Sequence, residues 1–275
     1  LGISLETLKR YKEAIAEYQA ALKTKPGWFD AMKSLANVYE TLEMKDAALA
    51  QWTQILLHTP ENVEALTRKG RLLLSANKPD QAIALYQKAI SIDPSFIPAV
   101  LSLESLLEDQ LEYERALKEL KRVNKLFPQN QEVLLAMGKL YLKTEDYPEA
   151  RTALLSILEK DRKNIPALKT LAQLYIKTGN LNTAQKCFKR ILSLAPSEVQ
   201  FMYEVAEILY KMQNYKEASQ YLKTYLAERP KDIDAYFLFA KILEEKNKPD
   251  QALKTYEKIL RLDTGNTQAL AAVSR

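Results

Sequence analysis

The stretch KPDQAIALYQKAISIDP, residues 78–94, returns almost unchanged as KPDQALKTYEKILRLDT at residues 248–264. The two copies lie 170 residues apart (248 − 78 = 170), which is five times 34. A fixed period of about 20–50 residues is typical of repeat architectures. The first question is therefore whether the whole chain of 275 residues repeats.

Three columns of residues recur every 34 residues along the chain. Proline occupies six of the eight stations that begin at Pro26, with Arg162 and Thr264 as the exceptions. A second column, beginning at Gly2, is small at seven of eight stations, with Glu104 as the exception. The third column is alanine throughout, and we expect all eight members to be buried at close helix contacts, where a larger residue would overpack. These are Ala14, Ala48, Ala82, Ala116, Ala150, Ala184, Ala218 and Ala252.

Each unit of 34 residues has the pattern of two helices. In residues 29–62, apolar side chains recur at i, i+3, i+4 and i+7 from Met32 to Tyr39, which indicates an amphipathic helix. The pattern resumes from Ala48, and Pro60 ends the second helix because proline disfavours helical geometry in the residue before it. The unit is thus a helical hairpin. Since neither helix can bury its apolar face alone, stability should come from stacking on neighbouring hairpins.

An aromatic column accompanies these patterns: Tyr18, Trp52, Tyr86, Phe188 and Tyr256. With this column, the 34-residue period, the small columns and the terminal proline, the whole chain resembles the tetratricopeptide repeat family. The resemblance implies an all-α fold, a right-handed α–α superhelix (solenoid) of 34-residue helical hairpins. We expect a single array over residues 1–275: a partial repeat at 1–28, complete repeats at 29–62, 63–96, 97–130, 131–164, 165–198, 199–232 and 233–266, and a last helix fragment at 267–275.

The composition gives little support for catalysis. The chain is 47% hydrophobic and 27% charged, with a formal net charge of +5 and no long run of one sign. Cys187 is the only cysteine and His58 the only histidine, so they can form neither a disulfide framework nor a zinc site. Nucleophilic catalysis needs a base near the nucleophile, and the six glycines form no phosphate-binding loop. We therefore predict no enzyme activity, no cofactor and no metal.

Two further classes of partner are disfavoured. Most of the fifteen tyrosines occupy core or turn columns instead of a basic stripe, which argues against nucleic acid as a partner. No apolar stretch of 18 residues occurs, so we expect no direct membrane insertion. The chain is expected to be soluble, and its single cysteine is compatible with a reducing compartment such as the cytoplasm.

The resemblance implies that the first helices of the hairpins line a concave groove that holds a peptide of a partner protein. Helical geometry places residues 2, 5, 9 and 12 of each unit on one face beside the core face. The predicted groove residues are Lys33, Asn37, Arg71, Leu101, Ser105, Leu135, Lys139, Leu142, Lys169, Gln173, Tyr203, Glu207, Tyr210, Phe237 and Lys241. The exposed leucines and the aromatic residues among them are the expected anchors.

The groove face also carries a charge pattern. The units that begin at Gln131 and Ile165 are expected to be basic, and the next two units acidic. The residues concerned are Lys139, Lys143, Lys169 and Lys177 in the basic part, and Glu204, Glu207, Asp234, Glu244 and Glu245 in the acidic part. Opposite charges along one concavity would orient an elongated ligand and speed its encounter.

The sequence thus predicts a non-catalytic scaffold that binds a peptide or helical segment of another protein, whose identity the sequence does not give. A carboxylate clamp for chaperone tails, known in this family, matches at Lys33 and Asn37 but not at Arg68, Pro98 or Ser102. Two alternatives stay open. The array could assemble with copies of itself as a homo-oligomer, or it could be the targeting arm of a larger enzyme or membrane-associated machine.

Overall fold

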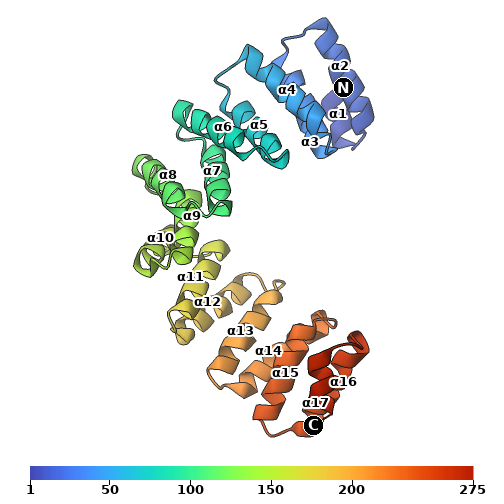
Figure 1. The fold of residues 1–275 in the computed structure, drawn as a ribbon, viewed down its shortest axis with the longest axis vertical. Helices are drawn as coiled ribbons and strands as arrows, with labels where there is room; N and C mark the ends of the chain where they lie inside the picture. Colours follow the sequence, from blue (N-terminus) through green and yellow to red (C-terminus); the bar gives the residue numbers. More distant parts are fainter. Residues whose placement is uncertain (275) are drawn as a thin grey trace. The chain divides into compact units, whose positions relative to one another are not determined.

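The structure is a computed structural model, and it describes residues 1–274. Over these residues it contains helices and no strand, as the sequence predicts (Figure 1). The helices are α1 Gly2–Thr7, α2 Tyr11–Thr24, α3 Phe29–Thr41, α4 Lys45–His58, α5 Val63–Ser75, α6 Pro79–Ile92, α7 Ile97–Asp109, α8 Tyr113–Leu126, α9 Gln131–Lys143, α10 Tyr147–Lys160, α11 Ile165–Lys177, α12 Leu181–Leu194, α13 Gln200–Lys211, α14 Tyr215–Glu228, α15 Ile233–Glu245, α16 Pro249–Leu262 and α17 Thr267–Val273.

The helices pair as hairpins, each made of an odd-numbered first helix and an even-numbered second helix (Figure 1). The chain divides inside α9 into two compact units, Leu1–Leu140 and Tyr141 onward. In the first unit, α3 packs on α4, α4 on α5 and α5 on α6, and α5 also contacts the next first helix, α7. In the second unit, α11 packs on α12 and α13 on α14, while α13 also contacts α15. Within each unit, every hairpin therefore buries its apolar face against the next one.

The alanine column lies in the core, as predicted. Seven of its eight members have no exposed surface, and Ala252 is 2% exposed. All eight stand on second helices, where an alanine methyl is the largest group that fits between closely packed helices. The column accordingly fixes how near each second helix can come to its neighbours.

The aromatic column packs against the small column of the first helices. A methyl group added to Gly70 would lie 2.5 Å from Cε1 of Tyr86, and one added to Gly2 would lie 2.6 Å from Cε1 of Tyr18. These distances are far below van der Waals contact, so glycine makes the room that each ring fills. Trp52, Tyr86 and Phe188 are among the largest side chains that are fully buried. Glu104, the exception in the small column, is only partly buried on α7.

The turn inside each hairpin contains one residue in the left-handed region, a feature that the sequence analysis missed. Its members stand 34 residues apart, and only one of them is glycine. Leu111, for example, has φ 61° and a side chain that is 70% exposed. The left-handed conformation disfavours residues with a Cβ atom, so stacking of the flanking helices must hold it in place. The residues are Lys9, Glu43, Asn77, Leu111, Glu145, Gly179, Gln213 and Asn247.

The packing of the alanine column can be tested on α6, where Ala82 is fully buried and Ala84 is exposed. We expect Ala82→Leu to lower the free energy of unfolding by roughly 1 to 3 kcal/mol, because the added methyl groups have no space. Ala84→Leu should change it by less than about 0.5 kcal/mol. Urea unfolding followed by circular dichroism measures both values, and equal effects at the two positions would contradict the packing described here.

Candidate functional site: the exposed face of the first helices

The structure places all fifteen predicted groove residues on first helices, and none of them is buried. We call the surface that they form the first-helix face. Lys139, Lys169, Gln173 and Lys241 are exposed, and the aromatic members are partly buried. The first-helix face is therefore available to a ligand, and its role in binding stays a prediction.

In the first unit, several of these residues line one hollow of about 460 Å³. Arg71 on α5 and Leu101 and Ser105 on α7, all of them predicted groove residues, lie in its wall. Glu132 of α9 and the buried Tyr86 of α6 complete the polar part of the lining. The remaining lining residues are Leu74, Pro98, Ser102 and Leu106. The hollow thus combines an apolar wall with a few polar groups, which is the usual composition of a ligand site.

Two other predicted positions near the N-terminus already interact within the chain or beside it. Lys33 Nζ lies 2.6 Å from a carboxylate oxygen of Glu64 on the next first helix. Glu40 accepts a hydrogen bond from Trp52 Nε1 at 2.7 Å and an ion pair from Arg68 at 3.1 Å. The positive charge of Lys33 is therefore partly neutralised, which weakens the partial match to a carboxylate clamp. As partly exposed pairs, these contacts contribute little to stability.

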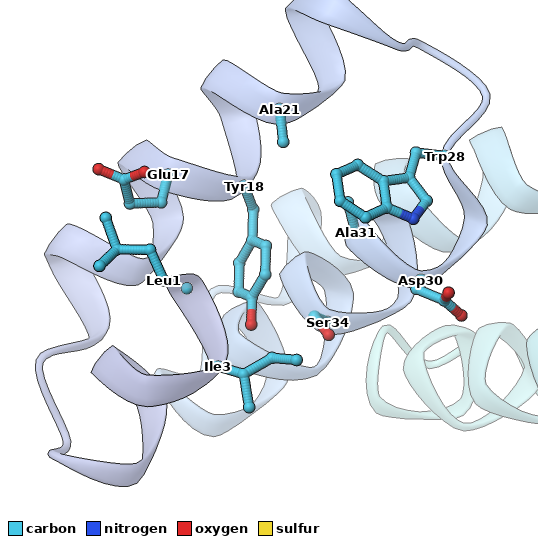
Figure 2. A pocket seen from close by; sticks show the side chains of 10 residues that line it. Leu1, Ile3, Glu17, Tyr18, Ala21, Trp28, Asp30, Ala31 and Ser34 are labelled. Carbon is cyan, nitrogen blue, oxygen red and sulfur yellow. The ribbon is translucent and has the colours of Figure 1, made fainter.

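A second pocket, of about 220 Å³, lies between α1, α2 and α3 and was not predicted (Figure 2). Figure 2 shows Tyr18 pointing into it from α2, with its hydroxyl end near Ile3 and Ser34. The Tyr18 hydroxyl donates a hydrogen bond to the carboxylate of Glu6. Burial and this carboxylate raise the pKa of Tyr18 to about 12. The hydroxyl is consequently held as a donor over the whole physiological pH range.

The bond between an aromatic donor and a glutamate twelve residues earlier recurs along the chain. Besides Glu6 with Tyr18, it joins Glu40 with Trp52, and Glu244 with Tyr256 at 3.0 Å. In each case the ring comes from the second helix and the carboxylate from the first helix of the same hairpin. A buried polar group is costly unless it is hydrogen-bonded, so the glutamate satisfies the polar end of the ring. A search for charged residues twelve positions before the aromatic column would have found this pairing in the sequence.

The pairing makes a prediction about stability that compares two tyrosines of the aromatic column. We expect Tyr18→Phe to lower the stability of α1 and α2 by about 1 kcal/mol, because it removes a satisfied hydrogen bond. Tyr86→Phe should leave the stability of α5 and α6 unchanged or raise it, because the Tyr86 hydroxyl is buried without a hydrogen-bond partner among residues 1–274. Hydrogen exchange of the amides in these helices measures each local effect. A loss of protection in the Tyr86 variant equal to that in the Tyr18 variant would show that the two hydroxyls are equally satisfied.

In the second unit, the predicted aromatic anchors stack on aromatic rings of second helices. The ring centroids of Tyr203 and Tyr225 are 5.6 Å apart, and those of Phe237 and Tyr256 are 6.0 Å apart. Tyr210 makes a similar contact, which is 5.8 Å between centroids, with Tyr215 on α14. One side of each anchor is therefore fixed by intramolecular packing, while part of its surface stays open to a partner.

The surroundings of Tyr203 are acidic, as the charge pattern of the sequence predicts for this part of the chain. Burial raises the pKa of Tyr203, and the charges of Glu207, Asp234, Asp232 and Glu204 raise it further. Burial also raises the pKa of Glu204, and the nearby Glu207 adds to this shift. Lys169 and Lys211 oppose the shift of Glu204. A cluster of carboxylates around a partly exposed ring favours a cationic or aromatic group in a ligand.

The raised pKa of Glu204 predicts a pH-dependent effect on stability. When a folded-state pKa exceeds the unfolded-state value, ionisation of the group costs stability, and this cost appears as pH rises through and above about 4. We therefore expect Glu204→Gln to be more stable than the parent at pH 7, and the difference to disappear at about pH 3. Thermal unfolding at the two pH values measures this effect. A variant that is less stable than the parent at pH 7 would contradict it.

The predicted basic middle of the first-helix face stays a prediction. Lys139 is exposed on α9 in the first unit, and Lys169 is exposed on α11 in the second unit. Lys169 Nζ lies 5.8 Å from the ring centroid of Phe201, which is within the range of a cation–π contact. Part of its charge is thereby directed to a ring of its own chain.

Few groups on the described chain are arranged for catalysis or metal binding. Within residues 1–274 no group of three or more His, Cys, Asp or Glu side chains is placed to hold a metal ion. Cys187 is buried, and burial raises the pKa of its thiol, which disfavours the nucleophilic thiolate. Over the same residues, no helix is both long and apolar enough to cross a lipid bilayer.

Family models match several parts of the sequence. Models described as tetratricopeptide repeat match residues 1–27, 63–96 and 109–171. A model described as subunit 3 of the anaphase-promoting complex (cyclosome) matches residues 156–225 and 177–259. No curated protein matches the chain by sequence.

Solved structures of helical repeat proteins are similar to the whole fold. A tetratricopeptide repeat protein from Parabacteroides merdae has 20% identity and a TM-score of 0.63, with 90% of this chain and 97% of that chain covered. PilF of Pseudomonas aeruginosa has 21% identity and a TM-score of 0.61, with 76% and 95% covered. A chain of the APC/C hetero-tetramer Cut9–Hcn1 has 17% identity and a TM-score of 0.59 and covers all of this chain, which spans 54% of that one. At these identities the likeness shows the fold alone.

Proposed function

Since the chain belongs to the tetratricopeptide repeat family and is a protein–protein interaction scaffold, we propose that its first-helix face binds an extended or helical segment of a partner protein. Proteins of this family are generally non-catalytic. The proposal extends this to the present chain: it acts by binding, without chemistry of its own.

The observation that carries the proposal is the hollow of about 460 Å³ in the first unit. Its lining joins side chains from α5 and α7, two successive first helices, with one from α9. An extended peptide that lies across successive first helices would contact all three. Leu74 and Leu101 supply apolar surface, and Arg71 and Glu132 supply charges that would set the register of the peptide.

The second unit supports the same function with different chemistry. Tyr203, Tyr210 and Phe237 are partly exposed on α13 and α15, and carboxylates surround Tyr203. We propose that basic or aromatic residues of the partner contact these rings. The basic residues Lys139 and Lys169 would in turn favour acidic residues in the segment that lies beside them.

Site-specific crosslinking tests the proposal directly. We expect a photoreactive phenylalanine in place of Tyr210 or Phe237 to form the same adduct with a partner in cells that express the full-length protein. The same group in place of Lys223, which is exposed on the second helix α14, is the matched control and should form no such adduct.

An adduct that forms only from Lys223 would place the binding surface on the second helices and refute the proposal. The molar mass of the protein over a wide range of concentrations separates partner binding from self-assembly. If the adduct is a second copy of this chain and the mass rises with concentration, self-assembly replaces the proposed function.

A further inference from the structure

The hydroxyl of Tyr86 differs from the other donors of the aromatic column. The Tyr86 side chain has no exposed surface, and its hydroxyl has no hydrogen-bond partner among the described residues. The residue twelve positions earlier is Leu74, where the hairpins of Tyr18, Trp52 and Tyr256 each have a glutamate. Because an unsatisfied buried donor is costly, this hairpin lacks the carboxylate that its own tyrosine requires.

The Tyr86 hollow and the pocket of Figure 2 are equivalent places in two repeats. Tyr18 and Ser34 line the pocket, and Tyr86 and Ser102, each 68 residues later, line the hollow. Two substitutions distinguish them: Leu74 stands at the position of Glu6, and Arg71 at that of Ile3. The hollow has therefore lost an internal anion and gained a cation at its wall.

Arg71 is positioned to act together with Tyr86. It is exposed, and it makes no hydrogen bond or ion pair with any residue that the structure describes. Burial raises the pKa of Tyr86, whereas the charge of Arg71 lowers it, so the guanidinium acts electrostatically on the hydroxyl. A neutral hydroxyl and a guanidinium that face one small volume are both donors, and a carboxylate is the acceptor that satisfies both.

We propose that the hollow at Tyr86 and Arg71 binds the carboxylate of an aspartate or glutamate side chain of the partner segment, at the place where other hairpins hold their own glutamate. The inference rests on the proposed function and specifies its ligand. A hollow of about 460 Å³ has room for residues beside the acidic one. Leu74 and Leu101 in its wall favour apolar neighbours.

Access to the hydroxyl requires only small side-chain movements. Leu74 is partly buried and Arg71 exposed, so a change of rotamer in either uncovers Tyr86 without a change in the backbone. Glu132 lies in the opposite part of the lining. Its equivalent in an earlier repeat, Glu64, pairs with Lys33, but the position of that lysine is taken here by Leu101. Glu132 therefore opposes an anion, which makes it an informative control.

The test uses the whole chain and two blocked peptides, acetyl-Ser-Leu-Glu-Leu-Ser-amide and its glutamine counterpart. The blocked ends exclude recognition of a terminal carboxylate. We expect the glutamate peptide to bind about tenfold more tightly, because its carboxylate accepts charge-assisted hydrogen bonds. Side-chain NMR signals of Arg71 and Tyr86 report both the affinity and the place of binding.

Four variants check the roles of the lining residues. Arg71→Gln should remove most of the preference for glutamate, and Tyr86→Phe should reduce it a few-fold. Leu74→Glu, which restores the glutamate of the other hairpins, should abolish the preference because its carboxylate occupies the place. Glu132→Gln should keep or increase the preference, since it removes an opposing charge and not a donor.

Two results would overturn the inference, and each differs from a failure of the proposed function. If both peptides bind the hollow equally well, the first-helix face still binds peptides, and the carboxylate site is wrong. If neither peptide shifts the signals of Arg71 or Tyr86 at millimolar concentration, the hollow is no site for an acidic side chain. The crosslinking from Tyr210 and Phe237, in the other unit, then decides separately whether the first-helix face binds a partner.

Discussion

The packing of one large ring onto one small residue in each hairpin sets the terms for the rest of the structure. Tyr86 fills the space above Gly70, and Tyr18 that above Gly2, at distances that leave no room even for a methyl group. This contact brings the second helix close to the first and makes the buried alanine column necessary. It also directs the polar end of the ring toward the first helix. The core thereby determines which residue of the first-helix face must supply an acceptor.

A repeat protein of this kind keeps its core regular and varies the residues around it. The glutamates that satisfy Tyr18, Trp52 and Tyr256 are parts of the regular pattern, since each one lies twelve residues before its ring. Leu74 breaks the pattern without changing the core, because only the partner of the hydroxyl is lost. Departures of this type mark the places where a repeat has been adapted to something outside the chain. They are more informative about function than the residues that conform.

The two units present different chemistry on equivalent helices. The first unit offers a cation and apolar side chains around a hollow. The second offers aromatic rings whose inner sides are held by Tyr225, Tyr215 and Tyr256, and whose surroundings are acidic. Rings fixed by packing lose little conformational freedom when a partner binds, which favours their use as anchors. Charges of opposite sign on different first helices would determine the direction in which a bound segment runs.

The sequence alone determined the helical hairpins, the buried alanine column and the face on which the predicted groove residues lie. All of these follow from local periodicity, because a helix places residues three and four apart on one side wherever it packs. The left-handed turn residues, such as Leu111, were missed because no residue preference marks them and the stacked helices impose their conformation. Only the tertiary structure decided which predicted residues converge, as Arg71, Leu101 and Ser105 do, and which are already engaged, as Lys33 is with Glu64. It also showed that Tyr86 lacks an acceptor. The physical reason is that these relations join side chains from different helices, whose distances depend on packing and rotamers and not on spacing along the chain.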